Sequence, residues 1–151
     1  MTAPLVDVST VSVHQDLGDT LEGCVRSLAA QLAQAGRLAD VEAYVADVLA
    51  REAQGATALP GGVALPHARS AGVAVPSVGV ATLPAPVTAA NGEEFDLVLL
   101  LAVPRDGADQ YLRLLSQVTT AVVKPAFRDD CRRAETPERL ASLAAAAVGG
   151  R

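Results

Sequence analysis

His67 is the residue of this sequence whose surroundings most favour chemistry. It directly follows Pro66, at the end of a short apolar run that begins after a Pro60-Gly61-Gly62 turn. An imidazole that is held by a hydrogen bond at one nitrogen can use the other as a nucleophile, because near neutral pH it is largely unprotonated. Such a histidine can accept a phosphoryl group without a separate base and then pass it on.

A phosphoryl-transfer site also needs positive charge against the phosphoryl oxygens. Arg51 lies upstream of His67, at the end of a predicted helix. Its planar guanidinium can bind two phosphate oxygens and stays charged. The spacing of the two residues leaves a structural alternative open, in which His67 caps a loop and Arg51 pairs with a surface carboxylate.

Several other kinds of site are excluded by the residues present. The chain has two histidines, His14 and His67, and no cluster of carboxylates that could complete a zinc site. Its single lysine, Lys124, is not part of a phosphate-binding Gly-x-x-x-x-Gly-Lys motif, and no Gly-x-Ser-x-Gly motif occurs. We therefore expect no metal and no cofactor. No motif surrounds His14, which we expect to be a surface or sheet-edge histidine.

Length and composition set the class of protein. The 151 residues are enough for one domain, expected to span residues 1–151, and only 3% of them are aromatic, so its core must consist of Ala, Val and Leu. The net charge of -5 and the pI near 4.9 argue against nucleic acid as a partner, because phosphate backbones are bound by basic patches.

The sequence predicts a cytoplasmic protein without direct membrane insertion. No apolar run is long enough to span a bilayer, and the N-terminus lacks the pattern of a signal peptide. Cys24 and Cys131 match no metal or redox spacing, so we interpret both as reduced thiols.

Two helices are predicted before the His67 segment. The first begins at a capping box with Asp19 as the N-cap and Glu22 as its partner, and it ends at Gly36. The second is capped by Asp40 and ends near Gly55. Arg51 therefore falls in the last turn of the second helix.

Buried strands alternate with the remaining helices. The pattern predicts strands at residues 63–65, 78–83 and 95–103, a loop at 84–91, a helix opened by Asp109, a short helix at 126–133 and a final helix starting at Thr136-Pro137. The helix after Asp109 is expected to bury Leu112, Leu115, Val118 and Val122. His67 would lie at a strand end, where the chain turns away and the side chain can reach solvent. This mixture predicts a single α/β domain with helices covering a sheet.

The segment from Arg51 to Pro76 carries a family signature. It reads Arg51-Glu52, Thr57, Gly61-Gly62-Val63-Ala64-Leu65-Pro66-His67-Ala68-Arg69, Gly72-Val73 and Pro76 in order. This pattern resembles the active-site signature of the enzyme IIA domains of the fructose/mannitol type, which belong to the bacterial phosphoenolpyruvate-dependent sugar phosphotransferase system (PTS). The buried run at residues 95–104 and the helical residues 112–115 also resemble this family, so the resemblance covers nearly the whole chain.

The resemblance implies a fold and a function. The fold would be a mixed β-sheet flanked by helices. His67 would be phosphorylated by the carrier protein HPr and would pass the group to a cysteine of an enzyme IIB domain or subunit, which serves a membrane permease. Arg51 would steady the phosphoryl group, and Glu52 would either orient Arg51 or be a solvated charge at the helix end. As an alternative function, IIA-like domains also act as regulatory modules, in which phosphorylation of the histidine controls protein–protein binding.

Tyr111 is the main departure from the family pattern. Many members have a second histidine at this position, which can hydrogen-bond the phosphoryl group or the active histidine. A tyrosine hydroxyl can donate one hydrogen bond but does not become cationic near neutral pH. Tyr111 would either replace that hydrogen bond or only pack against its neighbours. Arg69 could add positive charge to the phosphoryl group, contact the partner or be solvated.

Overall fold

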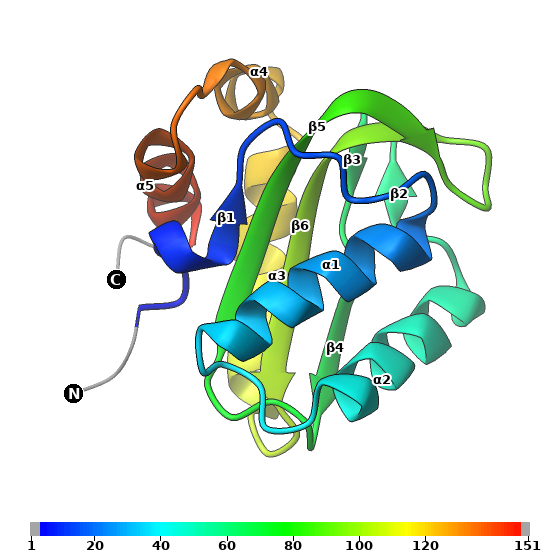
Figure 1. Cartoon of the computed structure of the whole chain (residues 1–151), viewed down its shortest axis with the longest axis vertical. Helices are drawn as coiled ribbons and strands as arrows, with labels where there is room; N and C mark the ends of the chain where they lie inside the picture. Colours follow the sequence, from blue (N-terminus) through cyan, green and yellow to red (C-terminus); the bar gives the residue numbers. More distant parts are fainter. Residues whose placement is uncertain (1–3, 149–151) are drawn as a thin grey trace.

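One mixed sheet with helices on both faces forms the core of the protein (Figure 1). The computed structural model describes residues 4–148. Its strands are β1 (Val11–Ser12), β2 (Ala58–Leu59), β3 (Val63–Ala64), β4 (His67–Ser70), β5 (Ser77–Thr88) and β6 (Glu94–Pro104). Its helices are the 3-10 helix η1 (Val8–Thr10) and the α-helices α1 (Leu21–Gln34), α2 (Val41–Gln54), α3 (Ala108–Val122), α4 (Pro125–Arg133) and α5 (Pro137–Ala147).

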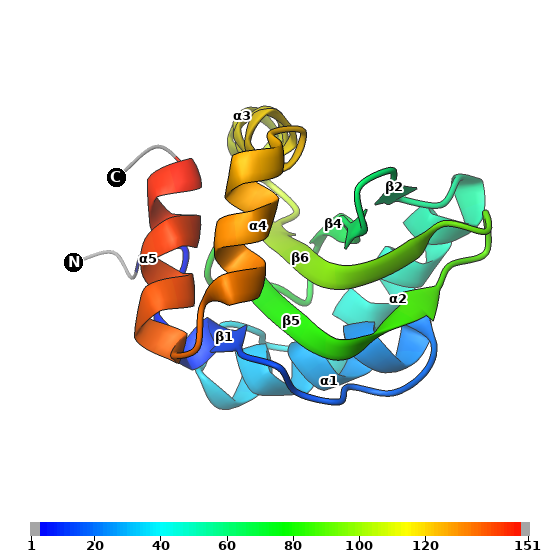
Figure 2. The same ribbon diagram turned by 90° about the horizontal axis from the view of Figure 1, so that it is seen from above.

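The helices are divided between the two faces of the sheet. Figure 2 shows α1 and α2 below the strongly curved strands β5 and β6, with α3 and α4 on the opposite side. Each face has its own apolar core, one against α1 and α2 and the other against α3, α4 and α5. The predicted class, a mixed sheet flanked by helices, is confirmed.

β6 is the central strand and is buried from Leu97 to Val103, as its apolar sequence predicts. β5 pairs with it in antiparallel orientation on one side, and β3 and β4 pair with it in parallel on the other. The strand order is β1-β5-β6-β3-β2, and β4 joins β6 beyond the end of β3. Residues of β3 and β4 are therefore positioned by backbone contacts with the most buried strand of the sheet.

β3 and β4 are two parts of one interrupted strand. Ala64 pairs with Val98 and His67 with Leu101, so the register with β6 is the same on both sides of the break. Pro66 interrupts the hydrogen-bond ladder because it has no N–H, but its carbonyl still accepts a bond from the Leu101 N–H at 3.1 Å. The prediction that the chain turns away at His67 is therefore wrong.

Most helix boundaries agree with the sequence. The Asp40 side chain accepts a bond from the Ala43 N–H at the start of α2, and Thr136 caps α5 with Pro137 in its first turn, as predicted. The N-cap of α1 is Thr20 rather than Asp19, because the Thr20 hydroxyl accepts the bond from the Gly23 N–H. The capping box predicted for Asp19 is wrong by one residue.

Two further elements differ from the prediction. Residues 84–88, expected in a loop, continue β5, with a shift in its pairing to β6 between Thr82 and Val87. In α3, Leu114 faces the core and Leu112 is 64% exposed, because only one side of this helix packs against the sheet.

Within residues 4–148 no helix is long and apolar enough to cross a membrane.

Candidate functional site

His67 is the first residue of β4 and is buried, with 6% of its surface exposed. His67 was expected at a strand end where the side chain can reach solvent; instead its strand continues along β6, and most of the side chain is buried. Its Nδ1 lies 2.7 Å from the carbonyl oxygen of Leu65. A carbonyl can only accept a hydrogen bond, so Nδ1 must carry the proton in this contact.

This contact leaves Nε2 of His67 with the free lone pair of a neutral imidazole. Nε2 has no hydrogen-bond partner within residues 4–148, and it is not among the polar atoms that are sealed from solvent there. The structure therefore holds the ring through one nitrogen and leaves the other accessible.

The surroundings of His67 favour its neutral form. Burial lowers the pKa of His67 below 6.5, because the imidazolium loses solvation, and the nearby charge of Arg51 acts in the same direction. The bond to Leu65 and the charge of Glu52 oppose this shift of the pKa but do not reverse it. A neutral imidazole with a free Nε2 is the form that can attack phosphorus.

We expect the ring of His67 to titrate below pH 6.5 in an NMR titration. A lowered folded-state pKa means that the unfolded chain binds the proton first, so the protein loses stability as pH falls below 6.5 and through the pKa of His67. His67→Gln, compared with wild type in urea unfolding from pH 7.5 to 5.5, should lose less stability over this interval. A midpoint at or above 6.5 would contradict the burial argument.

Arg51 lies in the last turn of α2 and is half-buried. Its Nη1 donates a hydrogen bond to the Gly55 carbonyl at 2.9 Å, and it forms no ion pair with any carboxylate in the described part of the chain. The surface ion pair considered as an alternative is therefore absent there. Its positive charge acts to lower the pKa values of both His67 and Tyr111, so Arg51 lies in the same region as these two side chains.

Tyr111 packs against His67 from the first turn of α3. The ring centroids are 5.8 Å apart, and the rings are tilted by 41°. Burial raises the pKa of Tyr111 despite the opposing charges of Arg51 and Arg69, so its hydroxyl stays protonated near neutral pH. This hydroxyl has no hydrogen-bond partner among residues 4–148 and is available as a donor.

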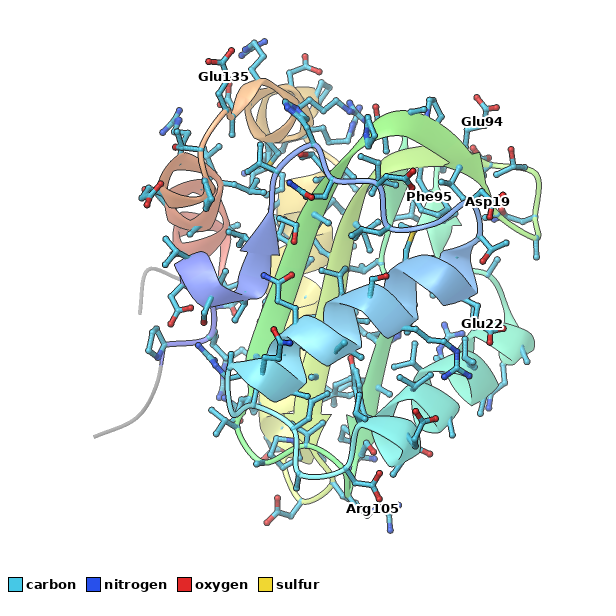
Figure 3. All side chains as sticks on the ribbon, viewed as in Figure 1. Asp19, Glu22, Glu94, Phe95, Arg105 and Glu135 are labelled. Atoms are coloured by element: carbon cyan, nitrogen blue, oxygen red, sulfur yellow. The ribbon has the colours of Figure 1, made fainter. Side chains whose placement is uncertain are left out.

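Arg69, two residues after His67 on β4, also contacts Tyr111. Its Cζ is 5.8 Å from the centroid of the tyrosine ring, at the distance of a cation–π contact, and its Nη1 donates to the Arg105 carbonyl at 3.0 Å. Figure 3 shows Phe95 and Arg105 towards opposite ends of β6. The contact with Arg105 therefore places Arg69 at the carboxyl end of β6.

Glu52 is half-buried and forms its hydrogen bonds with Thr57 instead of Arg51. Its carboxylate accepts two hydrogen bonds from Thr57, one from the backbone N–H at 2.8 Å and one from the hydroxyl at 2.7 Å. Both roles expected from the sequence, orienting Arg51 and remaining a solvated charge, are therefore wrong.

Two polar contacts beside the site had no signal in the sequence. Tyr44 is buried on α2, and its hydroxyl donates to the Leu101 carbonyl at 2.7 Å. Leu101 is the residue that pairs with His67 in the sheet. The other contact is the Leu65 carbonyl on His67. Both acceptors are backbone oxygens, which no residue type identifies.

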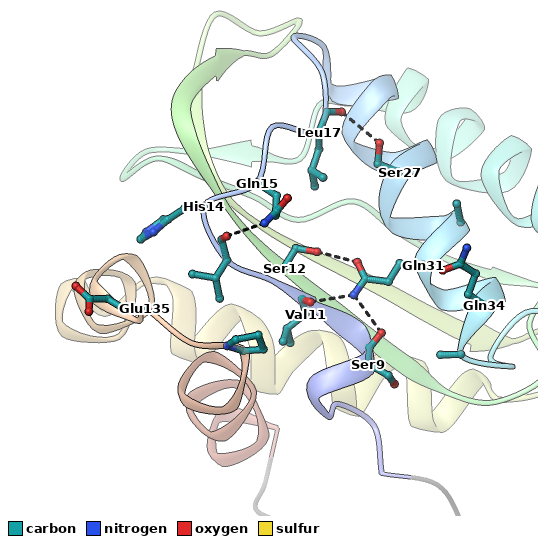
Figure 4. A pocket seen from close by; sticks show the side chains of 14 residues that line it. Ser9, Val11, Ser12, His14, Gln15, Leu17, Ser27, Gln31, Gln34 and Glu135 are labelled. Carbon is teal, nitrogen blue, oxygen red and sulfur yellow. Dashed lines mark hydrogen bonds between the residues drawn. The ribbon is translucent and has the colours of Figure 1, made fainter.

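A separate groove of about 990 Å³ lies between β1, α1 and the start of α5 (Figure 4). Gln31 crosses it and donates to the carbonyls of Ser9 and Val11, while Ser12 donates to Gln31 (Figure 4). His14 also lines the groove, and its Nε2 donates to the Arg132 carbonyl at 3.0 Å. His14 is exposed and follows the edge strand β1, which confirms its expected surface position.

Comparison with known proteins identifies related sequences. Residues 5–145 match the family model "Phosphoenolpyruvate-dependent sugar phosphotransferase system, EIIA 2". A nitrogen regulatory protein of Pseudomonas aeruginosa is 35% identical over 103 residues, which cover 67% of each chain. The 2-O-alpha-mannosyl-D-glycerate-specific EIIABC component of Escherichia coli is 34% identical over 80% of this chain, and the match spans 19% of that longer protein. A fructose-specific EIIA component of Haloferax volcanii is 27% identical over 95% of this chain and 98% of its own length.

Solved structures share the fold. The nitrogen regulatory protein IIA-Ntr of Neisseria meningitidis superposes with a TM-score of 0.77 over 92% of this chain and 95% of its own, at 22% identity. The mannitol enzyme IIA of Escherichia coli, solved in a complex with phosphorylated enzyme IIB, gives a TM-score of 0.71 over 95% of this chain and 96% of its own, at 18% identity. The overall arrangement of the sheet and helices is thus shared at low sequence identity.

Proposed function

Because the chain belongs to the EIIA 2 family of the phosphoenolpyruvate-dependent sugar phosphotransferase system, we propose that it is a phosphocarrier that uses His67. In this proposal Nε2 of His67 accepts a phosphoryl group from HPr and gives it to an enzyme IIB domain or subunit. The observation that carries the proposal is the contact between Nδ1 and the Leu65 carbonyl, which leaves Nε2 as the free nucleophile beside Arg51 and Tyr111.

The transfer needs few groups on the protein. The Nε2 lone pair attacks the phosphorus of the donor's phosphohistidine, the new N–P bond forms, and the donor nitrogen leaves with its electron pair. The phosphorylated imidazole is cationic while Nδ1 keeps its proton, and the Leu65 carbonyl stabilises it by accepting that N–H. In the second half, the acceptor's cysteine thiolate attacks phosphorus and Nε2 leaves.

Arg51 and Tyr111 have complementary roles in this proposal. Arg51 supplies a fixed positive charge to the phosphoryl oxygens, since no carboxylate in residues 4–148 neutralises it. The Tyr111 hydroxyl donates one hydrogen bond to the same oxygens. Arg69, which lies over the Tyr111 ring, adds positive charge at the edge of the proposed phosphoryl site.

The partners follow from the transfer. The mannitol enzyme IIA with the same fold was solved in a complex with phosphorylated enzyme IIB. We propose that this chain also binds an enzyme IIB, that HPr is its donor, and that it acts in the cytoplasm as a single IIA domain of residues 1–151. The membrane permease would be served indirectly, through the enzyme IIB.

A reconstitution tests this function. The protein is incubated with ³²P-labelled phosphoenolpyruvate, enzyme I and HPr, and a candidate enzyme IIB is then added. We expect acid-labile label on this protein, followed by transfer to a cysteine of the enzyme IIB. If HPr becomes labelled and this protein does not, the phosphocarrier proposal is wrong.

We expect Tyr111→Phe to slow labelling by about tenfold, because the ring still packs on His67 but the donor to the phosphoryl group is lost. Tyr111→His should remain competent, since an imidazole can also donate a hydrogen bond there. Initial labelling rates by HPr measure both. If Tyr111→Phe labels at the wild-type rate, the hydroxyl has no role and Tyr111 only packs.

The relative from Pseudomonas aeruginosa favours a second candidate function. That protein is named a nitrogen regulatory protein, so the present chain could use phosphorylation of His67 to control binding to another protein. A regulatory domain would be labelled by HPr and would keep the label when enzyme IIB proteins are added. A transport component would lose it to one of them.

A further inference from the structure

We propose that Glu52 is a positioning residue, which acts through Thr57 and Leu65 to select the nitrogen of His67 that receives the phosphoryl group. This inference rests on the proposed phosphoryl transfer at His67 and adds the part of the structure that controls its geometry. A chain of hydrogen bonds leads from the last turn of α2 to the imidazole.

The first link joins Glu52 to Thr57. Both carboxylate oxygens of Glu52 are used, since Oε2 accepts the Thr57 N–H and Oε1 accepts its hydroxyl. Thr57 is buried, with 7% of its surface exposed, and Glu52 is half-buried. Two charge-assisted bonds to one residue fix both its backbone and its side chain.

The second link joins Thr57 to Leu65. The Leu65 N–H donates to the Thr57 carbonyl at 3.3 Å, directly beyond the pairing of Ala58 with Ala64 in the β2–β3 hairpin. Thr57 thus extends the hairpin to the residue before Pro66. Because the strand is interrupted at Pro66, this bond holds Leu65 where the ladder to β6 is broken.

The third link joins Leu65 to His67. The Leu65 carbonyl, 2.7 Å from Nδ1, keeps the proton on that nitrogen and sets the rotation of the ring. If Leu65 shifts, the neutral imidazole can place its proton on Nε2 instead, and the nucleophilic lone pair then lies on Nδ1. The position of Glu52 therefore decides which nitrogen is available to the donor.

The Glu52–Thr57 bonds also keep two neighbouring charges apart. Glu52 follows Arg51 in the sequence, and an ion pair between them would neutralise the cation that faces the phosphoryl group. Thr57 occupies both oxygens of Glu52, while Arg51 is held separately by the Gly55 carbonyl at 2.9 Å. The last turn of α2 thus presents one free positive charge to His67.

The test uses Glu52→Gln and Thr57→Val, with Thr57→Ser as the conservative variant and Glu42→Gln as the control. Glu42 is on the same helix but lies in its first turn, exposed, where it contacts Arg26. The tautomer of neutral His67 is read from its ring ¹⁵N shifts, and ¹⁵N and ³¹P shifts identify the phosphorylated nitrogen. Labelling rates are measured with phosphorylated HPr, and urea unfolding gives the stability of each variant.

We expect Glu52→Gln and Thr57→Val to slow labelling about tenfold, the effect typical of losing an outer partner of a functional histidine. They should also shift His67 towards the Nε2–H tautomer and place part of the phosphate on Nδ1. Thr57→Ser, which keeps the hydroxyl, should restore the wild-type tautomer and rate, and Glu42→Gln should match wild type in both.

A wild-type tautomer in both Glu52→Gln and Thr57→Val overturns the inference, even where stability or rate falls, because the pair would then only be structural. The tautomer is measured without a phosphoryl donor. If wild-type protein is never labelled, the phosphocarrier function fails, and the tautomer measurement still decides the role of Glu52.

Discussion

His67→Ala is expected to lose all label in the reconstitution with phosphoenolpyruvate, enzyme I and HPr. The chain has only one other histidine, His14, whose Nε2 is already used by the Arg132 carbonyl. Removing His67 therefore removes the ring nitrogen that the structure holds as a free nucleophile near Arg51. Scintillation counting of the purified protein, with intact mass to detect one added phosphate, measures the loss.

Two controls make this result specific. His14→Ala should be labelled at the wild-type rate. His67→Gln keeps a side chain of similar size in the buried position, so it separates loss of the nucleophile from collapse of the site, and circular dichroism checks its fold. Label that persists on folded His67→Gln would show that another residue accepts the phosphoryl group.

Arg51→Ala is expected to slow labelling by roughly 100-fold, the usual cost of removing one group that stabilises developing charge. Arg51 forms no ion pair in residues 4–148, and its loss removes one exposed hydrogen bond, to the Gly55 carbonyl, so it should change stability by only about 1 kcal/mol. Arg51→Lys should recover part of the rate, because it restores the positive charge but not the planar guanidinium that can bind two phosphoryl oxygens. Stopped-flow or quench-flow labelling by phosphorylated HPr gives the rates.

The pKa of His67 shows whether Arg51→Ala acts through the loss of its charge or by disturbing the structure of the site. Its positive charge helps to lower the pKa of His67, so Arg51→Ala should raise the midpoint of the His67 titration relative to wild type. Arg26→Ala, which removes an exposed arginine on α1, serves as the matched control and should change neither rate nor midpoint. An unchanged rate in Arg51→Ala would remove this residue from the site.

Local patterns predicted most of the elements because they depend on near neighbours. The N-caps Asp40 and Thr136 and the buried run of β6 were confirmed, since caps and apolar periodicity are properties of short segments. The wrong predictions concern positions where a neighbouring residue can serve as the N-cap or fill the core position instead. Thr20 caps α1 in place of Asp19, and Leu114 takes the core position expected for Leu112.

The strand at residues 63–65 shows a different kind of limit. Its apolar residues and the following proline suggested an end, because Pro66 cannot donate to a ladder. Whether the strand resumes depends on β6, which lies far along the chain and keeps the same register with Ala64 and His67. This long-range pairing buries His67 instead of releasing it to solvent.

The family, the fold class and the residue types available for chemistry can be predicted from the amino-acid sequence. The signature around His67, with Arg51 upstream, identified the family because it combines several residues in a fixed order, and the family model and shared fold agree with it. These are properties of residue identity and spacing, which can be read without coordinates.

The atomic contacts of the site depend on how distant segments pack and cannot be predicted from residue types. The Leu65 carbonyl holds Nδ1, Thr57 takes both oxygens of Glu52, and Tyr111 reaches His67 from a separate helix. Backbone carbonyls are present at every residue, and a glutamate can bind any nearby donor. Their partners are therefore set by strand register and helix packing, which bring together segments that the sequence leaves apart.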